Sequence, residues 1–225
     1  MLDKLSVIRF DPHLLRSQPK VYDQLARLYC DVFAGEPFNE YRQCPVCNKY
    51  FSHDQVELQG ISSCSNGHAK SPLKIAWEVE PVKVEIMDQA SEPGFCGFLA
   101  LTQEDLAGFS WARIITFEEL RRHWDKEIVD VVQSRTALGE LVYFDELGVD
   151  PKKRGLGIGR KLVSSICKWA KDEHGELLTL LRTHQNSPAR HLFESAGYQK
   201  FAQDSEYGEG RIMMILDLCK NLVIR

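Results

Sequence analysis

A glycine-rich turn between a strand and a helix constrains the fold of this 225-residue chain more than any other feature. Residues 144–150 predict a strand, and Pro151 ends it because proline cannot donate to a sheet ladder. In the turn that follows, Gly155, Gly157 and Gly159 can adopt positive φ angles and let an oxygen approach the main chain closely. The unpaired N–H groups of the next helical turn would face that oxygen. The sequence therefore predicts an anion cradle for a phosphorylated cofactor.

The spacing of the glycines argues against two common phosphate-binding motifs. A dinucleotide fingerprint, G-x-G-x-x-G, needs a third glycine where Arg160 or Leu162 stands. A Walker loop needs Gly-Lys-Ser/Thr, whereas this turn continues as Gly159-Arg160-Lys161. Neither a Rossmann-type nor a P-loop nucleotide site is expected.

The turn does match the acyl-CoA signature R/Q-x-x-G-x-G/A, as Arg154-Gly-Leu-Gly-Ile-Gly159. With its flanks, Glu146-Leu-Gly-Val-Asp-Pro151 and Arg160-Lys-Leu-Val163, the segment resembles the GNAT superfamily of N-acetyltransferases. The resemblance implies an α/β fold, with a mixed central β-sheet flanked by helices, and acetyl-CoA as cosubstrate. The residues that it places at the cofactor are Leu147, Gly148, Val149, Arg154, Gly155, Leu156, Gly157, Ile158, Gly159, Arg160, Asn186 and Phe193.

A second segment carries the same resemblance. The run from Asn186 to Tyr198 is similar to the family pattern N-x-x-A-x-x-L-Y-x-x-x-G-F/Y. Locally it predicts a helix with Ser187 as N-cap and Gly197 at its end. Phe193 departs from the pattern, because most family members have a tyrosine there, positioned to protonate the departing CoA thiolate. A phenyl ring has no proton to give.

The resemblance implies direct acyl transfer from CoA to an amine, which needs a base because a protonated amine cannot attack. Glu146 matches the acidic position of the family's E-L-x-V string, and Asp145 is the second candidate. Neighbouring strand residues face opposite sides, so without a bulge only one of the two carboxylates can reach the cleft. Tyr198 and Tyr143 are candidate proton donors in place of Phe193. A purely structural role stays open for all four candidates.

A third pattern is typical of a zinc site. Cys44, Cys47, Cys64 and His68 have the spacing C-x2-C-x16-C-x3-H, which a single tetrahedral Zn²⁺ can collect. Each half resembles a zinc-ribbon knuckle, and a segment this short and polar would fold poorly without a metal. Four protein ligands close the coordination shell, so the predicted zinc is structural, or presents a surface to a substrate or partner. A deaminase-type catalytic zinc is not expected, because no H-x-E precedes Cys44.

The remaining cysteines and one histidine have other expected roles. Cys30, Cys96, Cys167 and Cys219 lie in apolar stretches, where small core residues are the default. His53 is a spare ligand candidate for the zinc, but a surface histidine is the expected outcome. Reduced thiols in a loop are the alternative to the zinc site itself.

Apolar periodicity predicts the other elements. Residues 6–10 predict a strand, residues 21–33 an amphipathic helix, and residues 98–101 with 106–114 a β-hairpin. Residues 81–90 fit either a short helix or a strand. A capping box starting at Thr116 opens a helix. Its apolar positions are Leu120, Trp124, Ile128 and Val131.

Composition and charge limit the class of protein. With 44% hydrophobic and 27% charged residues, the chain is expected to be globular, a single GNAT-like acyltransferase domain over 1–225 with a zinc-ribbon-like insertion at 41–72. A net charge of −4 argues against a nucleic-acid partner. The sequence has neither a membrane-spanning apolar run nor a signal-peptide pattern, so a cytoplasmic location without membrane contact is expected. A homodimer is an open option.

Two functions from different classes are compatible with the sequence. The favoured one is an acetyl-CoA-dependent N-acetyltransferase acting on a small-molecule or protein amine, with the zinc insertion shaping the acceptor side. The alternative is a non-catalytic acyl-CoA-binding or partner-binding protein whose zinc module recognises a partner, motivated by Phe193. Glu36, Glu40 and Glu78 could attract a cation, although such residues usually form a solvated face. The acceptor itself does not follow from the resemblance.

Overall fold

Seven strands form a mixed central sheet in the computed structural model, which describes residues 5–103, 105–175, 177–204 and 210–218. The strands run in the order β1 (Ser6–Phe10), β7 (Cys96–Leu101), β8 (Leu106–Thr116), β9 (Glu140–Val149), β10 (Leu178–His184), β12 (Arg211–Asp217) and β11 (Gln199–Gln203). Every neighbouring pair is antiparallel except β9 and β10, which are parallel. A strand–helix–strand crossover produces such a pair, so the predicted α/β class with a mixed sheet is confirmed.

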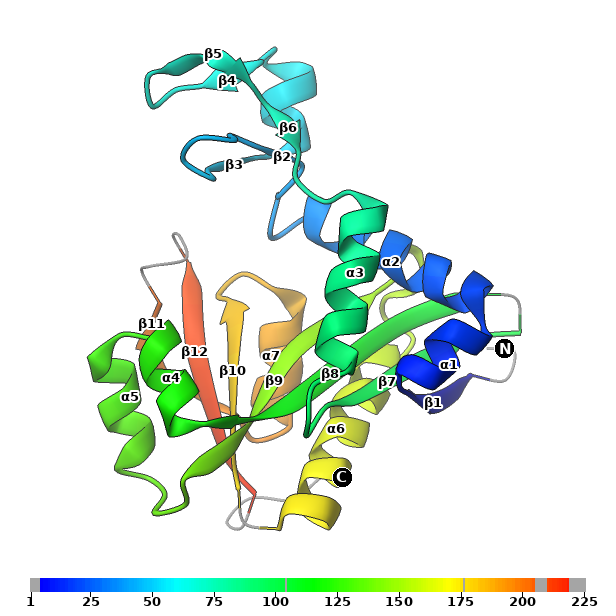
Figure 1. Ribbon diagram of the computed structural model, residues 1–225, viewed down its shortest axis with the longest axis vertical. Helices are drawn as coiled ribbons and strands as arrows, with labels where there is room; N and C mark the ends of the chain where they lie inside the picture. Colours follow the sequence, from blue (N-terminus) through cyan, green and yellow to red (C-terminus); the bar gives the residue numbers. More distant parts are fainter. Residues whose placement is uncertain (1–4, 104, 176, 205–209, 219–225) are drawn as a thin grey trace.

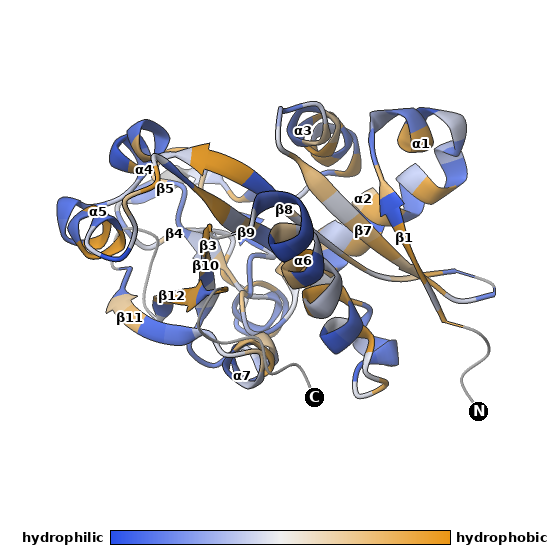
Figure 2. Cartoon of the chain, turned by 90° about the horizontal axis from the view of Figure 1, so that it is seen from below, coloured by the Kyte–Doolittle hydropathy of each residue, from blue (hydrophilic) through white to orange (hydrophobic). Residues whose placement is uncertain are grey.

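Helices cover both faces of the sheet (Figures 1 and 2). One face carries α1 (Pro12–Ser17), α2 (Pro19–Ala34), α3 (Val79–Ala90), α4 (Phe117–His123) and α5 (Lys126–Gln133), and the other carries α6 (Ile158–His174) and α7 (Pro188–Ser195). Along β9 the side chains alternate: Val142 and Phe144 pack with α6 and α7, whereas Leu141 and Tyr143 pack with α4 and α5. This period of two is what a strand covered on both faces requires. None of the helices in the described ranges combines the length and apolarity needed to cross a bilayer.

In two stretches, the sequence pattern alone did not determine the observed secondary structure. Residues 81–90, which fit a helix or a strand, belong to helix α3, whose buried side chains recur at helical spacing. The single helix expected over residues 116–131 is two helices, α4 and α5. Trp124 between them has an extended backbone, φ −138° and ψ 150°, and its ring packs edge-on against Tyr143 with centroids 5.1 Å apart. This packing outweighs the i+4 pattern, and Val132, one residue later than expected, is buried.

The parallel pairing of β9 and β10 is short. Three residue pairs join the two strands, the last being Phe144↔Leu181, and beyond it the strands diverge (Figure 1). On its other side β9 pairs with β8, where the register slips by one between Phe144 and Glu146. Asp145 is therefore the extra residue of a β-bulge. The divergence and the bulge lie at the same point of β9, and together they open the sheet there.

Residues 41–76, here called the arm, project from the body between α2 and α3 (Figure 1). The arm contains a three-stranded sheet of β3 (Tyr50–Phe51), β2 (Arg42–Gln43) and β6 (Lys74–Ile75), a π-helical turn at Asp54–Leu58, and a hairpin of β4 (Ser63–Cys64) and β5 (His68–Pro72). Its own core holds Cys44, Phe51 and Cys64, with a few partly buried neighbours. A core of this size is too small to stabilise a fold by itself.

Candidate functional site

A cavity of about 460 Å³ opens at the glycine turn, between the first turn of α6, the diverging end of β9, and α7. A short 3₁₀ turn, Pro151–Lys153, follows β9 and leads into the glycine turn. The basic side chains of Lys153, Arg154 and Arg160 lie along this cavity. Lining residues from these elements are Leu147, Val149, Lys153, Arg154, Gly155, Gly157, Ile158, Gly159, Arg160, Ser187, Pro188, Ala189 and Leu192. The first-turn N–H groups and the cations suit an anionic ligand, as the sequence predicts.

The three glycines of the turn have two different roles. Gly155 and Gly157 have φ angles of 79° and 78°, and open space surrounds the position of a Cβ at both. Gly157 is the N-cap of α6. Gly159 lies inside α6 with an ordinary helical φ, and a Cβ there would approach Leu192 Cδ2 to 3.0 Å. A positive φ is thus needed at the first two glycines, whereas the third lets α6 and α7 pack closely.

Four residues expected at the cofactor do not line this cavity. Gly148 lies over Phe109, and a Cβ at this position would meet the ring at 2.3 Å, so Gly148 is a packing glycine. Leu156 and Asn186 are exposed to solvent. Phe193 is buried and lines a second cavity, described below. The other eight predicted cofactor residues lie together at the first cavity.

A second cavity, of about 380 Å³, adjoins the first and shares Phe38, Leu147, Ser187 and Ala189 with it. Its wall combines aromatic rings with charged groups. The aromatic residues are Tyr29, Phe33, Phe38, Tyr50, Trp77, Tyr143, Phe144 and Phe193. The charged residues are Glu40, Glu85, Asp145, Glu146, Arg182 and Arg211. Electron-rich rings and a majority of carboxylates suit a cationic ligand such as an amine.

The β-bulge explains why both candidate base residues reach this cavity. Because Asp145 is the extra residue, it and Glu146 face the same side of the sheet, although regular alternation would separate them. Glu146 Oε1 accepts a hydrogen bond from the Tyr29 hydroxyl at 3.1 Å. Asp145 Oδ2 accepts one from Arg113 Nε at 3.2 Å. The two carboxylates therefore differ: one is held by a neutral donor, and the other is paired with a cation.

The environment also separates these carboxylates electrostatically. Burial raises the pKa of Glu146 well above its ordinary value, and the neighbouring Asp145 charge raises it further, against the Tyr29 hydrogen bond. Burial also raises the pKa of Asp145, but the Arg113 guanidinium opposes this shift. A carboxyl group with a raised pKa is the better proton acceptor near neutral pH.

The two candidate proton donors lie in different places. Tyr143 lines the second cavity, and burial raises the pKa of its hydroxyl, which stays protonated. Tyr198 is a described residue, but it lines neither cavity. It is buried in the core behind Phe193, with ring centroids 5.5 Å apart. The geometry thus brings Tyr143, and not Tyr198, to the cavity.

Several residues of the second cavity carried no signal in the sequence. Tyr29 belongs to the apolar face of α2, and nothing in its helical spacing marks the hydroxyl bonded to Glu146. Trp77 follows the arm, and its Nε1 donates to Glu40 Oε2 at 3.1 Å. The other oxygen of Glu40 accepts from Arg211 Nη2 at 2.6 Å. Of the three acidic residues considered as attractors of a cation, Glu40 alone is buried at the cavity, while Glu36 and Glu78 are exposed.

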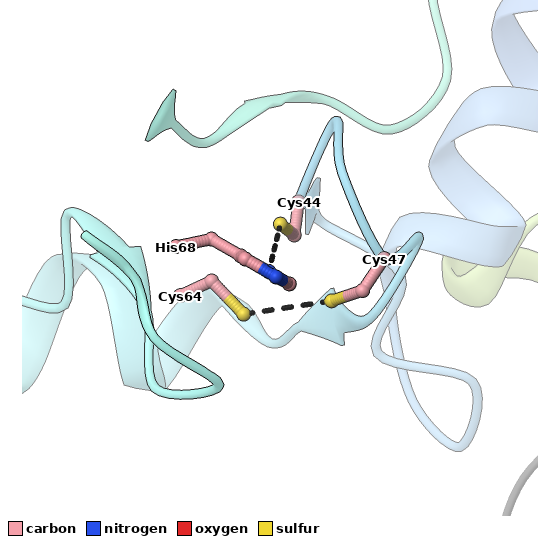
Figure 3. A group of neighbouring side chains, drawn as sticks. All are labelled: Cys44, Cys47, Cys64 and His68. Carbon is pink, nitrogen blue, oxygen red and sulfur yellow. Dashed lines mark hydrogen bonds between the residues drawn. The ribbon is translucent and has the colours of Figure 1, made fainter. Parts of the chain in front are cut away.

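The four predicted zinc ligands converge in the arm (Figure 3). Their ligand atoms all lie within 4.8 Å of one another. Cys44 Sγ is 3.6 Å from His68 Nδ1, and Cys47 Sγ is 3.6 Å from Cys64 Sγ. Four ligands about 2.3 Å from one tetrahedral ion lie roughly 3.8 Å apart. The cluster therefore has ligand types and separations that a Zn²⁺ ion could use.

Main-chain geometry favours the thiolate form of the first ligand. Removal from water alone would raise the pKa of Cys44, but N–H groups of Cys47 and Val46 that point at its sulfur lower the pKa to about 6. Asn48, with a φ of 57°, closes the turn by donating its N–H to the Cys44 carbonyl at 3.0 Å. His53 lies outside the cluster and is 62% exposed, as expected for a surface histidine.

The remaining cysteines follow the sequence expectation within the described residues. Cys96 and Cys167 are buried in the core, and Cys30 is half-buried. Burial raises the pKa of the Cys96 thiol to about 12 and that of Cys167 to about 11. These thiols behave as small apolar side chains. Cys219 lies outside the described residues.

Solved structures share this arrangement of sheet and helices. The structure of NAA60 from Arabidopsis thaliana in complex with acetyl-CoA has a TM-score of 0.56 and 16% identity, over 95% of this chain and 98% of the other. A polyamine N-acetyltransferase from Drosophila melanogaster has a TM-score of 0.57 and 14% identity, over 95% and 100% of the two chains. The α/β architecture with a mixed central sheet is thus the fold of these acetyltransferase structures.

The family follows from the sequence comparison. Residues 66–198, more than half of the chain, match the model of the acetyltransferase (GNAT) family, and the chain belongs to this family. Among curated proteins, it is 30% identical over 162 residues to a mycothiol acetyltransferase of Thermomonospora curvata, and 29% identical over 151 residues to one of Acidothermus cellulolyticus. These alignments cover 72% and 67% of this chain. The chain matches 47% and 43% of those relatives, which is less than half of their length.

Proposed function

We propose that the protein is an acetyl-CoA-dependent N-acetyltransferase that transfers an acetyl group to a primary amine. The observation that carries this proposal is the pair of adjoining cavities. One has main-chain N–H groups and basic side chains that suit a diphosphate, and the other has buried carboxylates and aromatic rings that suit an amine. Their shared wall at Leu147 and Ala189 is where the thioester and the amine would meet. Family membership and the acetyltransferase names of the relatives support the same reaction.

In the proposed reaction, the amine nitrogen attacks the thioester carbonyl carbon. A C–N bond forms, the C–S bond breaks, and the sulfur leaves as the CoA thiolate. Glu146 is the proposed base, because its raised pKa lets it take the proton that the ammonium must lose. Asp145, whose carboxylate accepts a hydrogen bond from Arg113, is the second candidate for the base. Tyr143 is the proposed proton donor to the thiolate, since Phe193 has no proton and Tyr198 lies behind it. The nitrogen loses a second proton as the amide forms, and this proton restores the Tyr143 hydroxyl.

The same proposal assigns a structural Zn²⁺ to the arm. Three thiolates and one imidazole would fill a tetrahedral shell and would leave no position for a substrate. The metal would replace the large apolar core that the arm lacks.

The proposal is tested by measuring release of free CoA thiol from acetyl-CoA across a panel of amines. The panel contains spermidine, agmatine, glucosamine, an aminoglycoside and a peptide with a free amino terminus. Acyl transfer to any of them supports an N-acetyltransferase. Bound CoA with no transfer to any acceptor would instead favour the non-catalytic acyl-CoA-binding alternative, which Phe193 motivates.

The glycine turn gives a prediction for cosubstrate binding. Gly157→Val places a β-branched residue at a φ of 78°, which costs about 1 to 2 kcal/mol, and adds a side chain at the wall of the cavity proposed to hold the diphosphate. We expect the Kd for acetyl-CoA, measured by calorimetry, to rise at least about tenfold. Gly175→Val is the matched control, because Gly175 has a φ of 59° at the other end of α6. Equal Kd values for the two variants would contradict the proposed site.

Burial of Glu146 gives a prediction for stability. Its folded-state pKa lies above that of the unfolded chain, so the folded state binds more protons between these two values. The free energy of unfolding therefore falls as the pH rises through this window. The fall is about 1.4 kcal/mol for each tenfold difference in the acid dissociation constant of Glu146 between the folded and unfolded states. Glu146→Gln removes this cost, and at pH 8 we expect a Tm about 2 °C or more above wild type. The difference should shrink towards pH 5, and a lower Tm at pH 8 would contradict it.

A further inference from the structure

The arm contributes directly to the second cavity. Tyr50, on β3 of the arm, lines the cavity together with Trp77, Glu40 and Glu146, which come from the body and from the arm's junction with it. The rings of Tyr50 and Trp77 are stacked, with centroids 6.4 Å apart and planes 15° from parallel. Tyr50 is 38% exposed, and its partial burial, with the charge of Glu40 nearby, raises the pKa of its hydroxyl. An aromatic face beside carboxylates is a recognition surface for an organic cation.

Tyr50 directly follows the turn that carries two residues of the Cys/His cluster. The chain turns at Cys44–Cys47, and the Lys49 carbonyl accepts the Cys44 N–H at 2.9 Å, directly before Tyr50. Tyr50 then pairs with Gln43. Because successive strand residues face opposite sides, Tyr50 reaches the cavity while Phe51 enters the small arm core with Cys44 and Cys64. The turn that carries two of the four ligands thus fixes the strand that carries Tyr50.

We propose that Tyr50 is a specificity-determining residue for the amine acceptor, and that a metal ion at Cys44, Cys47, Cys64 and His68 holds it in the cavity. The inference rests on the proposed N-acetyltransferase function. The acceptor is bound as an organic cation against the stacked rings of Tyr50 and Trp77, before Glu146 removes its proton. Metal binding in the arm therefore controls affinity for the acceptor and leaves affinity for acetyl-CoA unchanged, because none of the arm's described side chains lines the first cavity.

The test compares Tyr50→Ala and Tyr50→Phe with Val46→Ala in the zinc-loaded full chain. Val46 is the matched control, because it lies on the same turn, is 57% exposed and does not line the cavity. Calorimetry measures Kd for the panel amine with the highest turnover, in the presence of CoA, and agmatine is used if no amine is turned over. Tyr50→Ala should raise this Kd about tenfold, whereas Tyr50→Phe, which keeps the ring, and Val46→Ala should stay within about twofold of wild type.

Metal removal supplies the second comparison. Removing the metal from the wild-type chain with a chelator should raise the amine Kd as much as Tyr50→Ala does. Removing the metal from Tyr50→Ala should not raise its amine Kd further. Acetyl-CoA affinity should be the same in all samples. An unchanged amine Kd in Tyr50→Ala, or in the metal-free wild type, overturns the inference. Absence of acyl transfer by the wild type to every panel amine defeats the N-acetyltransferase proposal instead, and the two failures are distinct because Kd is measured without turnover.

Discussion

Replacement of Glu146 by glutamine should lower kcat for acyl transfer by about 10²- to 10³-fold while leaving the Kd for acetyl-CoA within about twofold of wild type. The carboxylate has the position and the raised pKa of a base, and the amide keeps the shape and can still accept the Tyr29 hydrogen bond. A glutamine cannot take a proton from the ammonium. Wild-type kcat should also rise with pH as the Glu146 carboxyl loses its proton, and this rise should be absent in the variant.

Two further variants separate this role from general effects of charge. Asp145→Asn should lower kcat less than Glu146→Gln does, because Asp145 is already paired with Arg113. Glu127→Gln, on the exposed face of α5, should leave kcat unchanged. Steady-state kinetics with saturating acetyl-CoA provides all three values. Unchanged turnover in Glu146→Gln would remove this residue from the mechanism, and a larger loss in Asp145→Asn would transfer the role to Asp145.

Removal of the metal from the arm should have the second large effect. Binding of a structural zinc supplies about 10 to 16 kcal/mol in small zinc modules, and the arm has few apolar residues to replace it. In Cys64→Ser we expect less than one zinc per chain and loss of amide-exchange protection over residues 41–76. The central sheet has its own cores on both faces, so its protection should persist.

Metal analysis and hydrogen exchange monitored by mass spectrometry measure these outcomes. Cys30→Ser is the matched control, because this thiol is half-buried in α2 and lies outside the cluster. It should retain one zinc per chain and full protection of the arm. A wild-type chain purified without bound metal, or an arm that stays protected in Cys64→Ser, would show that the cluster is only a set of neighbouring thiols.

The features that could be predicted from the sequence are those that depend on near neighbours in the chain. The glycine turn, the capping box at Thr116 and the N-cap at Ser187 each involve residues a few positions apart, and all three have the expected geometry. The Cys/His spacing likewise identified side chains that converge. Eight of the twelve predicted cofactor residues lie at one cavity because they belong to the same turn and strand end, or to its immediate flank.

What could not be predicted depends on residues far apart in the chain. The bulge at Asp145 results from pairing with β8, and periodicity alone allowed only one of the neighbouring carboxylates to face the cleft. Tyr29 reaches Glu146 from 117 positions away in the sequence, and within α2 its spacing is that of any apolar residue. Trp124 interrupts a regular helical pattern because its ring finds a partner on β9. In each case the observed geometry depends on a tertiary contact that the local sequence does not specify.

The early end of pairing between β9 and β10 has a consequence for how the protein can hold an elongated ligand. Beyond Phe144, β9 continues to Val149 with one edge that β10 does not reach, inside a sheet that is otherwise continuous. Backbone donors and acceptors exposed in this way need partners. CoA carries amide groups along its flexible chain, and such a ligand can lie in the gap as a substitute strand. Recognition by backbone atoms would not depend on the side chains of Leu147 and Val149, so binding of such a ligand would tolerate exchange of either side chain.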